Sequence, residues 1–305
     1  MAPTLLPFRP TSAQQAQKRA TQLASALPRP LDLTVASNRY AAAGLAVGTL
    51  APLLLGRGWK AALGTGMAGF SAWATARELD PDHPQTAAVA LPVAAVAALL
   101  GGAPNLLGSL TAVSSLRVLS ATVGHRPSQS DLLALGAQAA LSAFAGQRAA
   151  ALLPGAALSL AADAGDRFAP APEAALYGVA AGVLPPTLHR MEKAHKEKGK
   201  DGAEHGDGPK KASDRSVLTD LLSLAALGLS QTLAAPEAVR SGCDLVPTRV
   251  SAERVQRSRQ LALGALGLGL LLRESRGLAP LAAATLAVGL RRSGVLDAAA
   301  PKGRG

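Results

Sequence analysis

The chain has 305 residues, of which 49% are hydrophobic and 17% charged, and its formal net charge at pH 7 is +11. Its single cysteine excludes an intramolecular disulfide and any metal site built from several thiolates. A basic balance fits either nucleic acid or the cytoplasmic loops of a membrane protein. Because the basic residues cluster between apolar runs and aromatic residues make up only 3%, we expect a lipid bilayer as the partner and no nucleic acid.

Residues 1–39 form a basic N-terminal segment in which small apolar residues recur at helical spacing. An interfacial helix on anionic lipid and an ordinary solvated helix both fit this stripe, and its alanine content favours the solvated helix. The first apolar run begins near Tyr40, too far from Met1 for the usual signal peptide. We therefore expect the first membrane helix to act as the insertion signal.

Two apolar runs, 40–56 and 61–76, flank a basic turn at Arg57–Lys60 and predict a first helical hairpin. Trp59 in this turn suits the headgroup region of a bilayer, where amphipathic rings are enriched. Both runs are rich in glycine, which allows close approach of helix backbones in lipid.

The longest uncharged stretch of the chain runs from Thr86 to Leu116. A helix of about 20 apolar residues crosses a bilayer, so this stretch is nearly long enough for two crossings. Residues 101–105 have the sequence Gly-Gly-Ala-Pro-Asn, which is typical of a turn. The stretch predicts a helical hairpin inside a membrane.

A polar cluster comes directly before this hairpin and contains Arg77, Glu78, Asp80, Asp82 and His83. Carboxylates and imidazole together suit a divalent metal, which could activate a lipid diphosphate at the membrane surface. The structural alternative is a loop in which prolines end one helix and begin the next. In that interpretation Asp82 caps a helix and Arg77 pairs with Glu78 or Asp80. We favour this loop over a metal site, and the sequence does not say which metal such a site would bind.

Further apolar runs predict a hairpin over 132–162, single crossings over 173–188 and 217–235, and a last hairpin over 261–290. The segment Arg249–Arg259 is basic and predicts a surface helix. The sequence Leu-Ala-Leu-Gly-Ala occurs at 133–137 and again at 261–265, followed at the same interval by Arg148 and Arg276. This match suggests internal duplication, as in many transporters, although a chain built from Ala, Leu and Gly produces such matches by chance.

Two charged residues, Arg117 and Asp163, are candidates for positions inside the membrane. Such residues are expensive in lipid and tend to be functional. The alternative is that Arg117 extends its side chain to the interface and that Asp163 lies at a helix end.

These patterns predict an all-α fold, a polytopic bundle of roughly eight to ten short Ala/Leu/Gly-rich helices arranged as hairpins in the inner membrane. The predicted regions are a basic segment 1–39, a first bundle 40–190, a charged linker 191–216, a second helical region 217–292 and a tail 293–305.

Three function classes remain. A non-enzymatic structural or scaffolding membrane protein, with no cofactor, is the first, and a homo-oligomer is compatible with it. The second is a small permease built from repeated hairpins. The third is a metal-dependent enzyme acting on lipid or isoprenoid substrates through Glu78, Asp80, Asp82 and His83. A soluble Ala-rich helical protein is the alternative outside these classes.

Overall fold

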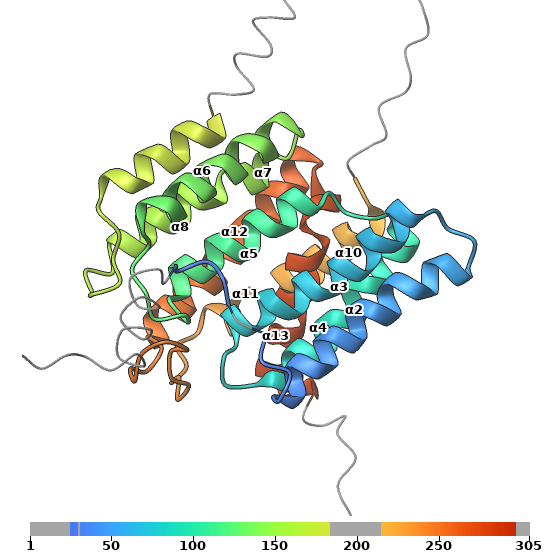
Figure 1. Cartoon of the computed structure of the whole chain (residues 1–305), viewed down its shortest axis with the longest axis horizontal. Coiled ribbons are helices and arrows are strands. Elements are labelled where there is room, and N and C mark those ends of the chain that lie inside the picture. The colour runs from blue at the N-terminus through green and yellow to red at the C-terminus, as the bar shows by residue number, and fades with distance from the viewer. Residues whose placement is uncertain (1–24, 30, 184–214, 297–305) are drawn as a thin grey trace, which may run out of the picture.

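The structure is a computed structural model that describes residues 25–29, 31–183 and 215–296, and these residues form α-helices joined by turns and loops, with no strands (Figure 1). The predicted all-α class is therefore confirmed for this part of the chain. The N-terminal stripe, nearly all of the charged linker and most of the tail lie outside the described residues. The predicted division into regions before and after the linker stays a prediction.

Ten helical passes follow one another in the described residues, some of them interrupted by a kink. They are α2 (Ala36–Leu54), α3 (Trp59–Leu79), α4 (Pro84–Gly101), α5 (Leu106–Ser120), α6 (Gln129–Phe144), α7 (Arg148–Ala151) with α8 (Leu153–Ala162), the helix Glu173–Val183, α10 (Val217–Gly228) with α11 (Ser230–Ala234), α12 (Ala252–Leu272), and η1 (Ser275–Leu278) with α13 (Ala279–Arg292).

Tight turns reverse the chain between α2 and α3, between α4 and α5, and between α6 and α7. Glycines with positive φ stand in these turns, Gly56 (72°), Gly102 (90°) and Gly146 (80°), a conformation that suits glycine. After the second turn, Asn105 caps α5 by accepting a hydrogen bond from the amide of Leu107 at 3.0 Å. The hairpin predicted over 86–116 is present as α4 and α5.

Because the passes alternate in direction, the helices meet at two ends. At one of them α3, α5, α8 and α13 end and α2, α4, α6 and α12 begin, towards the lower left of Figure 1. We call this the charged end. Ion pairs between Glu78 and Arg117 and between Asp166 and Arg254 join helix ends here. At the opposite end Arg148 pairs with Glu274, so the turns of two hairpins lie together.

Charge is absent from the middle of every pass. Charged residues of the described helices lie in the first or last turn, apart from Arg257 and Arg259 in the second turn of α12. The segments between are built mainly from Ala, Leu, Gly and Val, with a few hydroxyl, aromatic, proline and glutamine side chains.

The passes pack closely because many contacts involve glycine or alanine. A Cβ atom added at Gly48 of α2 would lie 3.1 Å from the Cα of Gly66 in α3. The largest core cluster combines α3 and α4 residues such as Trp73 and Leu91 with α13 residues such as Leu281. The passes after the linker therefore share a hydrophobic core with those before it.

One described helix, Pro84–Gly101, is long and apolar enough to cross a membrane by length and composition, and 39% of it is buried inside the protein. Several large apolar side chains lie exposed on the outer faces of other passes, including Leu54 (87% exposed), Leu271 (82%) and Leu133 (76%).

The segment 249–259 was predicted to form a surface helix, and its predicted exposure was wrong. The helix begins at Ala252, and the side chains of Arg254 and Arg259 are about 1% exposed. Each is buried because acceptors from distant parts of the chain surround its guanidinium group. Asp166 and carbonyl oxygens bind Arg254, and Glu237 and the carbonyl of Leu79 bind Arg259. The local charge pattern contains no trace of these partners.

Candidate functional site at the charged end

Glu78 is the most buried acid of the charged end. It lies in the last turn of α3 with 0% exposure, and Arg117 of α5 donates to it from Nε at 2.7 Å. Ser120 and Thr122 also donate hydroxyl hydrogen bonds to it, and Arg29 lies 3.5 Å away. These donors satisfy a carboxylate that burial alone would make costly to ionise.

Asp80 holds a second cluster. Its carboxylate receives two hydrogen bonds from Arg291 of α13, at 2.8 and 3.0 Å, and one from the hydroxyl of Thr86 at 2.8 Å. Arg291 also donates to Glu237, which pairs with Arg259 at 2.8 Å. The last turn of α3, the start of α12 and the end of α13 are thus joined through alternating charges.

The contacts of Asp82 and His83 differ from the predicted loop, in which Asp82 caps a helix. Asp82 accepts hydrogen bonds from the backbone amides of Arg240 and Ser241, at 2.8 and 2.7 Å, so it anchors the loop before α12. The residue at the N-cap of α4 is His83, which makes no side-chain capping bond. Its Nδ1 lies 2.8 Å from Asp80. The prediction that Asp82 caps a helix was therefore wrong, because distant amides compete for its carboxylate.

Arg77 turns away from the acids beside it in sequence. Its guanidinium donates to the side-chain oxygen of Asn38 at 3.0 Å and lies 5.0 Å from the ring centroid of Trp73. The expected pairing with Glu78 or Asp80 was wrong. Those two carboxylates face the bundle interior, where Arg117 and Arg291 meet them.

The acids of the predicted metal cluster therefore separate. Glu78, Asp80 and Asp82 each bind a different set of donors from a different part of the chain. Among the described residues no group of three or more His, Cys, Asp or Glu side chains is placed to hold a metal ion. The metal-site hypothesis gains no support from this geometry.

Arg117 and Asp163 also lie at the charged end. The guanidinium of Arg117 is 12% exposed and reaches Glu78 and the carbonyl oxygen of Leu27. Asp163 follows α8 with a side chain that is 74% exposed, and Arg257 pairs with it at 3.0 Å. The two lie at the ends of their passes.

The pKa of Glu237 is strongly lowered by its arginine partners. Burial opposes its ionisation and would raise the pKa, but hydrogen bonding to Arg291 and the positive charges of Arg259, Arg291 and Arg292 outweigh burial and lower the pKa to about 2. Glu237 is therefore ionised over the whole physiological range.

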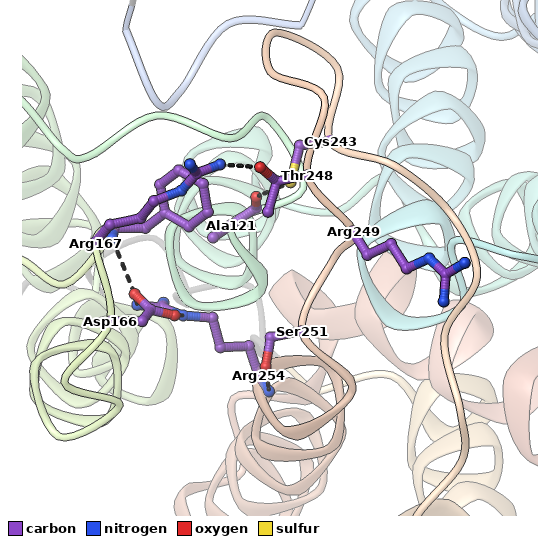
Figure 2. Close-up of a pocket in the computed structure, with 9 residues that line it drawn as sticks. Ala121, Asp166, Arg167, Cys243, Thr248, Arg249, Ser251 and Arg254 are labelled. Carbon is purple, nitrogen blue, oxygen red and sulfur yellow. Dashed lines mark hydrogen bonds and ion pairs between the residues drawn. The ribbon is translucent and has the colours of Figure 1, made fainter.

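A cavity of about 460 Å³ opens beside this network, between the end of α5, the loop after α8 and the start of α12 (Figure 2). Its walls include Arg167, Cys243, Thr248 and Ser251. Arg254 closes one wall by a bidentate pair with Asp166, both contacts at 2.7 Å. The hydrogen bonds from Arg254 hold the pKa of Asp166 below its usual value, against the effect of burial.

Sequence reasoning missed several charged members of the site, among them Arg29 and its ion-pair partner Asp244, and also Glu237, Arg254, Arg259 and Arg291. A usable signal existed for Arg259 and Arg291, because each borders a long apolar run just as Arg117 does. Arg29, Glu237 and Asp244 lie in polar connections, where no local pattern separates them from solvated charges.

Comparison with models of protein families and with curated proteins gave no match, and comparison with solved structures gave none either. The class of this protein is therefore argued from its own residues.

Proposed function

We propose that the chain is a non-catalytic, multi-pass integral membrane protein with a structural or scaffolding role, and that its charged end lies at the cytoplasmic surface. The observation that carries this proposal is the charge-free middle of all ten described passes, with ionised groups confined to their ends. A soluble helical bundle would place charges along the outward face of each helix.

The sidedness rests on arginine and lysine. Those at the opposite end are Arg57, Lys60, Arg148, Arg215, Arg273 and Arg276, whereas the charged end carries the remaining and more numerous basic residues of the described chain. Basic residues near helix ends favour the cytoplasmic side. Several charge-free middles are shorter than the about 20 residues of an average crossing, so we expect tilting or local thinning of the bilayer around them.

Buried ion pairs fit this placement. The buried acids Glu78 and Asp80 are matched by arginines of the same chain, and the partly exposed Asp166 pairs with the buried Arg254. The network of ion pairs holds several helix ends together. Such fixed contacts suit a structural role better than turnover of a substrate.

Two experiments test the membrane proposal. Membranes of expressing cells are washed with alkaline carbonate, and we expect the protein to stay in the pellet. In a Cys243→Ser background, Glu253→Cys then reports the charged end and Lys60→Cys the opposite end. A membrane-impermeant maleimide should label Lys60→Cys in intact cells and Glu253→Cys only after lysis. Release by carbonate would overturn the membrane class, and the reverse labelling would overturn the orientation.

A permease is the second candidate, favoured by hydroxyl and amide groups in the uncharged interior. Thr111 of α5 lies 2.9 Å from Ser142 of α6, and the buried side-chain oxygen of Gln138 has no hydrogen-bond partner in the described chain. Unpaired polar atoms in an apolar interior are costly and are common along substrate paths.

Flux separates the two candidates. Proteoliposomes are loaded with a pH-sensitive dye and a proton or sodium gradient is imposed. If the protein is structural, the ion flux should equal the leak of liposomes without protein. A permease for either ion gives a faster flux that the double variant Thr111→Val, Ser142→Ala removes.

A further inference from the structure

We propose that the cavity beside Arg167 binds a phosphate group. It lies at the charged end between Ala121, residues 166–168 and residues 243–254, and its volume of about 460 Å³ falls within the range of small-molecule sites, about 300–1,000 Å³ (Figure 2). The argument rests on which of its charged groups are already engaged and which are free.

Asp166 and Arg254 neutralise each other. Arg254 binds both carboxylate oxygens of Asp166 at 2.7 Å and also donates to the carbonyl oxygens of Leu119 and Ala161. The carboxylate therefore repels an incoming anion less than a free one would, and the pair forms a fixed wall of the cavity.

Arg167 supplies the uncompensated positive charge. Its guanidinium lies 4.6 Å from the ring centroid of Phe168 and donates to the hydroxyl of Thr248. Within the described residues no carboxylate pairs with it. In Figure 2 its side chain extends towards Thr248, above Ser251 and Arg254, whereas the side chain of Arg249 points away from them. A planar guanidinium with free donors matches the oxygens of a phosphate.

The start of α12 adds donors. Ser251 is its N-cap and accepts from the amide of Arg254 at 3.4 Å. The first amides of this 21-residue helix have no intrahelical acceptor, and the helix dipole favours an anion at this position. Two hydroxyl groups, on Thr248 and Ser251, line the same cavity.

The phosphate could belong to a phospholipid headgroup or to a small soluble phosphate compound. Both present the same oxygens to Arg167. Binding of a soluble phosphate needs no membrane, whereas the lipid source rests on the proposed position of the charged end at the bilayer surface.

The chain contains its own reporter, because its single cysteine, Cys243, lines the cavity. Burial raises the pKa of its thiol, so labelling is measured at mildly alkaline pH. Purified full-length protein in a phosphate-free detergent is treated with N-ethylmaleimide, and the rate of Cys243 modification is followed by intact-mass spectrometry. Inorganic phosphate is compared with chloride at equal ionic strength, and phosphatidylglycerol is compared with diacylglycerol.

The variant is Arg167→Gln and the matched control is Arg126→Gln, which removes the same charge from an exposed position at the same end but outside the cavity. We expect phosphate or phosphatidylglycerol to slow labelling several-fold in the wild type and in Arg126→Gln, and to have no effect in Arg167→Gln. Protection by phosphatidylglycerol alone assigns the phosphate to a lipid, and protection by inorganic phosphate as well shows that a small ligand suffices.

Two results would overturn the site: no slowing by either compound in the wild type, or equal slowing in Arg167→Gln. These outcomes are separate from the fate of the membrane proposal. Protein that carbonate releases, but that inorganic phosphate still protects, would retain the site and lose the membrane class.

Discussion

The guanidinium Nε of Arg259 donates a hydrogen bond to the backbone carbonyl oxygen of Leu79 at 2.7 Å, although 180 residues separate the two in sequence. Leu79 is the last residue of α3, so this carbonyl lacks an acceptor role within its helix. A side chain from the second turn of α12 thus completes the end of another helix. The charged end is held together by contacts of this kind as much as by carboxylates.

Glu78→Ala should destabilise the protein strongly. Truncation leaves Arg117 buried without its carboxylate, and breaking a buried ion pair costs about 3–5 kcal/mol. The measurement is thermal unfolding of detergent-purified protein by circular dichroism. The matched control is Glu173→Ala at an exposed helix start, which should change the melting temperature little. Equal melting temperatures of the two variants would contradict the claim that the ion pair of Glu78 stabilises the protein.

Arg291→Met should cost more stability than Arg292→Met. Arg291 binds both Asp80 and Glu237, whereas the ionic partner of its neighbour is Glu237 alone among the described residues. Loss of Arg291 leaves the buried Asp80 with only weaker donors. Denaturant unfolding of the two variants decides this, and a larger loss for Arg292→Met would show that Glu237 dominates the cluster.

Acid should weaken the network through Glu237. Its pKa is about 2 in the folded protein and about 4.5 when unperturbed, so its stabilising contribution is complete above about pH 4.5 and is lost as the pH falls towards 2. At pH 6 the melting temperature of the wild type should be higher than that of Glu237→Gln. This difference in melting temperature should shrink steadily below pH 4.5. The exposed Glu253→Gln provides the control. A difference that does not change with pH would mean that Glu237 acts through packing alone.

Gly66→Ala should disrupt the packing of α2 on α3. The added Cβ would lie 2.8 Å from the carbonyl oxygen of Leu45, a backbone atom that cannot move without shifting the helix. Overpacking of this kind typically costs about 1–3 kcal/mol. Gly264→Ala is the control, because the space around Gly264 is open. That substitution should leave stability unchanged or raise it, since alanine favours helix more than glycine does.

The sequence predicted the helices far better than the site. Apolar runs of the right length, with glycine and proline between them, located α4, α5 and the later hairpins, because these signals are local. The burial of Arg254 and the bonding of Asp82 to the amides of Arg240 and Ser241 depend on segments more than 80 residues away. The packing of the bundle determines which groups become partners, so the spacing of charges along one segment does not predict them.

The pairing of Asp80 with Arg291 has a consequence for biosynthesis. These residues are 211 positions apart, and Arg291 lies at the end of the last described pass. While the chain emerges from the ribosome, the acid of α3 is made long before its main counter-ion. In a product truncated before α13, the arginine left to pair with Asp80 among the described residues would be Arg259, at 3.8 Å, so the close ion pair of Asp80 forms only after α13 has been made.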